Sequence, residues 1–217
     1  MDYIFAPGCA LTIENSSAVD RLHQWLNQHV QEMEVLEVCC RNHPKLPAGA
    51  VVINGCAGCD RRYRENYEHA TTISLWEIID QENAWEFPDY LEQRMSVHDP
   101  CPIRSQARVH NAVRSLLKKM NINVVEAPKI KNKSVCCGDS AWGKMPSDRI
   151  KLKMKKRADQ MPEKEIVVSC VSCIKSIHIG GKRPRHIVDL LFGEKTRIGE
   201  HEPDIWHSEL EKYVKNH

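Results

Sequence analysis

The chain has 217 residues, enough for one domain or for two of about 100 residues each. Its 41% hydrophobic and 28% charged residues fit an ordinary globular protein, and the formal net charge of +2 gives no reason to expect nucleic acid or membrane surfaces as partners. No apolar run approaches the roughly 20 residues of a membrane span, and Pro7-Gly8 interrupts a start that lacks the basic segment of a signal peptide, so we expect a cytoplasmic protein.

The first predicted element is a short apolar strand in YIFAPGC (3–9), which ends in a proline turn and Cys9. An amphipathic helix follows, since apolar residues recur at helical spacing. They are Ala18, Val19, Leu22, Trp25, Leu26 and Val30. A strand-like run, MEVLEVCC (33–40), comes next, and AVVINGC (50–56) predicts a strand that ends at a C-x-x-C motif. Another apolar run begins at Ile73.

The second half of the chain repeats this order. MSVHDPC (95–101) predicts a strand, a proline turn and a cysteine. The helix that follows has its apolar stripe at Val109, Ala112, Val113, Leu116, Leu117 and Met120. INVVEAP (122–128) is strand-like, EIVVSC (165–170) predicts a strand that ends at a second C-x-x-C, and an apolar run begins at Ile187.

One predicted helix, residues 147–161, has no counterpart in the first half, where the short RNHPKLPAG takes its place. We expect Ser147 to cap this helix. Its buried stripe is predicted at Ile150, Met154, Ala158 and Met161. The charged run KLKMKKR (151–157) is typical of a solvated helix face, with the docking of an acidic partner or an anionic substrate as the alternative.

Strands that alternate with helices predict an α/β fold with mainly parallel sheets. We expect two pseudo-symmetric repeats, residues 1–90 and 91–193, each a small sheet with flanking helices. Residues 194–217 form a polar tail with a short helix at 204–215. Ligands of such sheets gather at the carboxyl ends of strands, which is where the cysteines lie.

Ten cysteines are the most unusual feature of the composition, because a reducing compartment favours metal binding or redox chemistry over disulfides. They form two quintets of the same order: one cysteine alone, an adjacent pair, then C-x-x-C. The first quintet is Cys9, Cys39, Cys40, Cys56 and Cys59, and the second is Cys101, Cys136, Cys137, Cys170 and Cys173. A single zinc on the two C-x-x-C pairs would leave six cysteines unexplained, and a thioredoxin-like motif would leave more.

Iron–sulfur ligation explains the quintets better, because a cluster is several ångströms wide and binds several thiolates. An ordinary cubane needs four cysteines, however, and each half offers five. Neighbouring side chains of an extended segment leave opposite faces of the backbone, so Cys136 and Cys137 suit a wide target that is contacted from two sides.

With its single cysteine, CCG and C-x-x-C, the second half resembles the cysteine-rich CCG domain, and the doubled arrangement resembles the CCG-containing subunit of heterodisulfide reductase over roughly residues 1–193. The resemblance implies two noncubane [4Fe-4S] clusters, each held by the five cysteines of one quintet. In the first quintet Arg41 stands where the family motif has glycine, and the spacer that follows is short. A cubane or zinc therefore remains an alternative for that site.

The resemblance also implies an oxidoreductase that cleaves a small disulfide, or oxidises thiols, at the clusters. The chain has no G-x-G-x-x-G fingerprint, so electrons are expected from a ferredoxin or a flavin/iron–sulfur subunit. The alternative function is an electron carrier or redox sensor without substrate chemistry. His98 and His178 are expected to be structural histidines near the second site, with proton donation as the alternative, and Trp76 and Trp142 are expected in the core.

Overall fold

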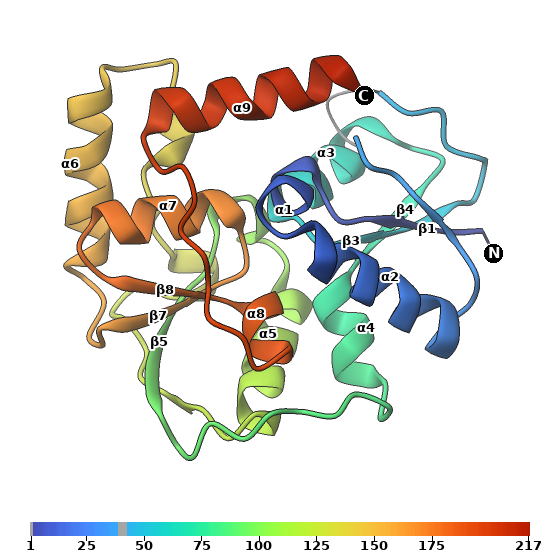
Figure 1. Ribbon diagram of the computed structural model, residues 1–217, viewed down its shortest axis with the longest axis horizontal. Coiled ribbons are helices and arrows are strands. Elements are labelled where there is room, and N and C mark those ends of the chain that lie inside the picture. Colours follow the sequence, from blue (N-terminus) through green and yellow to red (C-terminus); the bar gives the residue numbers. More distant parts are fainter. Residues whose placement is uncertain (1, 39–42) are drawn as a thin grey trace. The chain divides into compact units, whose positions relative to one another are not determined.

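The computed structural model describes residues 2–38 and 43–217 of the chain. It divides into two compact units (Figure 1). The first comprises Met1–Trp85 together with Leu210–His217, and the second comprises Glu86–Glu209. Among the described residues, no helix combines the length and the apolar character that a bilayer crossing requires.

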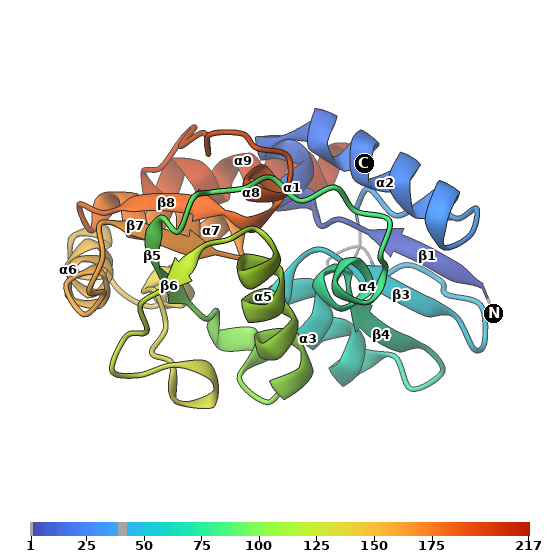
Figure 2. The same cartoon turned by 90° about the horizontal axis from the view of Figure 1, so that it is seen from below.

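The first unit is built on a parallel sheet with the strand order β2-β1-β3-β4. Its elements, in chain order, are β1 (Tyr3–Ala6), α1 (Cys9–Glu14), α2 (Ser16–His29), β2 (Glu34–Val35), β3 (Val51–Asn54), α3 (Ala57–Asn66), β4 (Thr71–Ser74) and α4 (Leu75–Gln81). Because right-handed crossovers to β2 and to β4 leave in opposite directions, α2 and α3 cover opposite faces of this sheet, as Figure 2 shows.

The second unit has a parallel sheet with the corresponding order, β6-β5-β7-β8. Its elements are β5 (Arg94–His98), a 3₁₀ turn (Cys101–Ile103), α5 (Ala107–Lys119), β6 (Asn123–Val124), two 3₁₀ turns (Lys131–Lys133 and Asp139–Ala141), α6 (Ser147–Ala158), β7 (Glu165–Val168), α7 (Val171–Ile179), β8 (Arg183–His186) and α8 (Ile187–Leu191). The two identical strand orders confirm the predicted α/β class and the two repeat-like halves.

The strand-like runs before each adjacent cysteine pair form less strand than the sequence predicts. Only Glu34–Val35 and Asn123–Val124 pair with β1 and β5, respectively. Both are edge strands, and the chain leaves the sheet after two residues to form the loop that leads to each cysteine pair. β-Propensity alone does not specify how far an edge strand stays paired.

Helical periodicity predicts the packed faces well. The predicted stripe of α5 is buried throughout, whereas in α2 the residues Trp25 and Val30 at the margin of the stripe are partly exposed. Burial of such a face contributes about 25 cal/mol per Å² of apolar surface, which is the main stabilisation of a helix of this length.

α6 lies beside α7 (Figure 1) and buries the predicted stripe of Ile150, Met154 and Ala158. The predicted cap is wrong, because Ser147 is already the first helical residue and Pro146 occupies the cap position. The Ser147 hydroxyl donates instead to the Asp204 carboxylate at 2.5 Å. No side chain in the described part of the chain caps the N-terminus of α6.

The predicted helix near the end of the chain is confirmed as α9 (Pro203–Asn216). Its Trp206 is 1% exposed, and the indole N–H donates to the Ser172 hydroxyl at 3.3 Å. The ammonium of Lys175 lies 4.7 Å from the centre of the same ring. This aromatic side chain therefore packs on α7, the helix that carries Cys173.

Candidate metal centre

The strand order of each sheet defines where a ligand would bind. In the order β6-β5-β7-β8, the connection that leaves β5 runs to one side of the sheet and the connection that leaves β7 runs to the other side. Ligands of open parallel sheets bind at the carboxyl ends of the two strands that flank such a switch point. Cys101 follows β5 at the start of a 3₁₀ turn. Cys170 follows β7 at the cap position of α7, and Cys173 lies one turn further along that helix.

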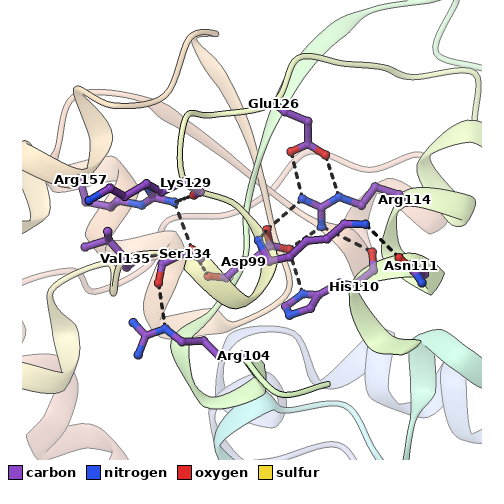
Figure 3. A network of polar contacts seen from close by, with 11 residues as sticks. Asp99, Arg104, His110, Asn111, Arg114, Glu126, Lys129, Ser134, Val135 and Arg157 are labelled. Atoms are coloured by element: carbon purple, nitrogen blue, oxygen red, sulfur yellow. Dashed lines mark hydrogen bonds and ion pairs between the residues drawn. The ribbon is translucent and has the colours of Figure 1, made fainter. Parts of the chain in front are cut away.

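The loop that carries Cys136 and Cys137 is fixed to the end of β5 through Ser134 (Figure 3). The Ser134 hydroxyl donates to the Asp99 carbonyl at 2.8 Å, and Arg104 donates through Nε to the Ser134 carbonyl at 2.8 Å. These bonds bring the adjacent pair to the strand end that also carries Cys101.

Asp99 is the centre of the polar network in Figure 3. Its carboxylate accepts two hydrogen bonds from Arg114, at 2.5 and 2.9 Å, one from His110 at 3.2 Å and one from the Lys131 N–H at 2.7 Å. Burial raises the pKa of Asp99, but the hydrogen bonds from His110 and Arg114 and the charge of Arg114 outweigh it and hold the pKa well below its usual range. The ionised carboxylate fixes the turn before Cys101.

The five cysteines of the second unit converge on one place. Their thiols act on one another in a chain that runs from Cys101 through Cys136, Cys137 and Cys173 to Cys170. All five are thiols and not disulfides. The structure thus brings together the whole second quintet that the sequence predicts as ligands.

Cys136 is the cysteine of this group whose ionised form its neighbours favour. Hydrogen bonds from the Cys101 and Cys137 thiols lower the pKa of Cys136 far below its usual range, against the opposing effect of burial. The Ser140 hydroxyl at 3.0 Å and the Gly138 N–H at 3.4 Å act in the same direction. The pKa of Cys101 and that of Cys137 are raised, chiefly because each thiol donates to Cys136. The contacts within the group thus favour ionisation of Cys136 over that of Cys101 and Cys137.

The quintet has a buried side and an accessible side. Cys137 and Cys173 are 5% and 3% exposed, whereas Cys101, Cys136 and Cys170 are partly exposed. Solvent can therefore reach the site from the side of Cys136 and Ser140, and the opposite side is closed by protein.

His98, at the end of β5, lies on the buried side. One of its ring nitrogens and the sulfurs of Cys137 and Cys173 lie within 4.8 Å of one another. Its Nδ1 accepts a hydrogen bond from Arg157 Nε at 3.1 Å. Burial, together with the Arg157 charge, lowers the pKa of His98 to about 4, so the ring is neutral at neutral pH.

Arg157 is the site residue that the sequence does not reveal. It ends the charged run KLKMKKR, which predicts a solvated helix face, yet it is 2% exposed. The helical periodicity could have predicted its burial. Arg157 follows the buried Ile150 and Met154 by seven and three positions, so it lies on the same face of α6.

Three further expectations have different outcomes. Trp76 is buried, as predicted. Trp142 is only partly buried and stacks on His207 with ring centres 4.0 Å apart, so the expectation that it belongs to the core is wrong. His178 lies in the last turn of α7 and forms an edge-to-face contact with His201. Both rings are tied to other side chains of the second unit.

In the first unit, Cys9, Cys56 and Cys59 occupy corresponding positions after β1 and β3. Gly8, with φ of 90°, makes their approach possible, because a Cβ at this residue would lie 2.7 Å from Cys56 Cβ and 3.6 Å from Cys59 Sγ. The residue before Cys9 thus lies against Cys56 and Cys59. The predicted ligands Cys39 and Cys40 lie outside the described residues.

The donor set of the second unit suits a metal or an iron–sulfur group. Thiolates are soft ligands, and five sulfurs in contact need a cation before more than one or two of them can ionise together. The N-terminus of α7 adds a favourable field at Cys170 and Cys173. The residues present therefore fit such a group, and any that bound here would be held mainly by sulfur.

Comparison with known proteins agrees with this geometry. Residues 95–178 match the family model of the cysteine-rich domain, CCG. No curated protein matches the chain. The matched range begins within β5 and ends within α7, so it contains the complete second quintet and His98. The similarity to the CCG domain therefore covers the part of the chain that holds the second quintet.

Proposed function

We propose that the chain is an iron–sulfur oxidoreductase that reduces a small disulfide, or oxidises the corresponding thiols, at two noncubane [4Fe-4S] clusters. One cluster is assigned to Cys101, Cys136, Cys137, Cys170 and Cys173, and the other to Cys9, Cys39, Cys40, Cys56 and Cys59. The observation that carries the proposal is the convergence of all five cysteines of the second unit, within a CCG domain, at the point where the sheet order changes direction.

The number of thiolates favours a noncubane cluster over the alternatives. Structural zinc and cubane clusters each use four protein ligands. The chain of thiol contacts through Cys136 and Cys137 leaves no cysteine of the quintet outside the group. The resemblance to the CCG-containing subunit of heterodisulfide reductase implies a noncubane [4Fe-4S] cluster, which binds five thiolates.

The unequal burial of the quintet supports substrate chemistry over electron carriage alone. Cleavage of a disulfide consumes two electrons and two protons and releases two thiols, and bound clusters would supply the electrons one at a time. The accessible side at Cys136 would admit the disulfide, while the buried side at Cys137 and Cys173 would exclude water. The electrons would come from a ferredoxin or a flavin/iron–sulfur subunit.

Metal analysis of anaerobically purified protein tests the cofactor. We expect about eight irons per chain and little zinc, as two four-iron clusters require. Two zincs and no iron would contradict the proposal entirely. About four irons with one zinc would restrict it to the second unit and make the first a structural zinc site.

The activity is tested with an artificial low-potential electron donor and a panel of small organic disulfides, with thiol release as the readout. The wild-type protein should release two thiols per disulfide consumed, and Cys101→Ser should abolish the release. Ser105→Ala, at an exposed position in the same segment, is the matched control and should behave as wild type. If iron-loaded protein passes electrons to an acceptor but never releases thiols, the electron-carrier function replaces this one.

A further inference from the structure

Arg157 carries a buried positive charge that has only neutral hydrogen-bond partners. Its guanidinium donates to His98 Nδ1 at 3.1 Å, Gln160 Oε1 at 2.9 Å, the Ser134 hydroxyl at 3.2 Å and the Lys129 carbonyl at 3.3 Å. Among the residues that the structure describes, no carboxylate bonds to it. A charge on a side chain that is only 2% exposed is costly unless an opposite charge lies near it.

Asp99 carries a negative charge that favours ionised Arg157, but its carboxylate is already bound by other residues. Asp99 is held by both nitrogens of the Arg114 fork and by His110. Burial lowers the pKa of Arg157, and the charge of Asp99 opposes this effect. Through its hydrogen bond to His98 the guanidinium is linked to Cys137 and Cys173, because a ring nitrogen of His98 and these two sulfurs lie within 4.8 Å of one another. The charge of Arg157 is thus directed at the buried side of the cysteine quintet.

His98 sits next to this charge, and its hydrogen bond fixes its tautomer. Since Arg157 donates to Nδ1, the proton of the neutral ring is on Nε2. Nε2 is fully buried and has no acceptor among the described residues. Neither nitrogen then offers a lone pair to a metal, so His98 is no ligand, even though it lies with Cys137 and Cys173 in a geometry that could hold an ion.

We propose that Arg157 and His98 are positioning residues that set the redox potential of the second site, Arg157 through its buried charge and His98 through its Nε2–H. Both stabilise the more negative, reduced state of an iron–sulfur group on the buried side, and so raise its midpoint potential. The inference rests on the proposed function, since it requires an iron–sulfur group held by Cys137 and Cys173.

The test is an anaerobic redox titration followed by electron paramagnetic resonance, with iron content measured on each sample. Arg157→Gln removes the charge but keeps a donor, and Lys156→Gln removes one charge from the exposed face of the same helix. We expect Arg157→Gln to weaken one-electron reduction of one centre about tenfold, a shift of about 59 mV to lower potential. Lys156→Gln, and the centre of the first unit in both variants, should stay within twofold of wild type.

A second variant keeps the test decisive if Arg157→Gln does not hold iron. His98→Leu removes the Nε2–H and leaves the arginine. It should lower the midpoint potential of the same centre, by an amount that corresponds to an about threefold smaller equilibrium constant for its one-electron reduction. Pulsed resonance of the wild type should show no strong nitrogen coupling of the kind that a histidine ligand produces. Iron-loaded variants with an unchanged potential, an equal shift in Lys156→Gln, or a coordinated nitrogen would overturn the inference alone. Wild-type protein without iron would overturn the proposed function with it.

Discussion

The two units share a sheet order, and a clear difference between them lies in the connection from the edge strand to the third strand in the sequence. In the second unit, the connection from β6 to β7 contains two 3₁₀ turns and α6. In the first unit, the connection from β2 to β3 is short, and residues 43–50, the part that the structure describes beyond the cysteine pair, contain no helix. Both units nevertheless place a single cysteine after the first strand and a C-x-x-C after the third strand in the sequence.

The comparison separates what the sheet provides from what α6 provides. The ends of two adjacent parallel strands carry Cys101 and Cys170 in the second unit, and Cys9 and Cys56 in the first. α6 adds a packing surface for the segment that follows Cys136 and Cys137. Met154 packs against Gly138, which has φ of 115° and whose added Cβ would lie 2.9 Å from Met154 Cγ and 3.1 Å from its backbone nitrogen.

The sequence difference at this position follows from the helix. A glycine after the cysteine pair is required where α6 lies against it, because any side chain there would meet both Met154 and an unfavourable backbone conformation. In the first half the corresponding residue is Arg41, which lies outside the described residues, and no helix within residues 43–50 corresponds to α6.

The largest expected effect comes from removing one ligand in each unit. Cys137→Ser should lower the iron content from about eight to about four per chain, because oxygen is a poor substitute for a thiolate that joins the buried part of the quintet. Cys59→Ser is the matched change in the first unit. Equal losses would mean that both units hold the same group. If the iron content and the spectra of Cys137→Ser are unchanged, Cys137 is not a ligand.

A smaller effect is expected from the glycine that α6 requires. Gly138→Ala should lower the free energy of unfolding of the second unit by about 3 kcal/mol, since it combines a strained backbone with overpacking against Met154. Gly143→Ala is the matched control, because Gly143 also has a positive φ, of 74°, but has no atom within 4 Å of an added Cβ. It should cost about 1 kcal/mol. Chemical denaturation measures both, and equal losses would show that packing against α6 is unimportant.

The smallest expected effect is on the loss of stability at low pH. His186, in β8, is buried, and burial lowers its pKa to about 3, whereas the unfolded chain has the ordinary value near 6.5. The unfolded state therefore binds an additional proton between these values, so the stabilisation is complete above about pH 7 and is lost as the pH falls through this range. His186→Leu should reduce the stability difference between pH 7 and pH 5 by about 2 kcal/mol.

Denaturation at the two pH values checks this expectation and sharpens the comparison, since none of the described histidines of the first unit is buried. The acid sensitivity should belong to the second unit alone. It should be reduced and not abolished in the variant, because His98 remains, with its pKa of about 4. An equal loss of stability in the variant and the wild type would show that His186 is not the group that titrates.

The sequence predicts the parallel sheets and the place where the cysteines meet, because both follow from local patterns. Strand, turn and cysteine recur twice, and strand ends of a parallel sheet share one edge. It does not predict the role of Arg157, since a charged residue in a charged run is usually solvated and only the packing of α6 on the strand end buries it. The role of Ser147 escapes local patterns for a similar reason, because its partner Asp204 is distant in the sequence.

The parallel topology has a consequence for assembly. Each ligand-bearing strand end is separated from the next by a crossover, so Cys101, Cys137 and Cys173 meet only after β5, β6 and β7 have all joined one sheet. Contacts between segments so distant in the chain form late and slowly. A chain that emerges from the ribosome therefore exposes its thiols one segment at a time. The complete quintet exists only once α7 has been synthesised and docked, and oxidation of the nascent thiols before that moment would compete with loading of the site.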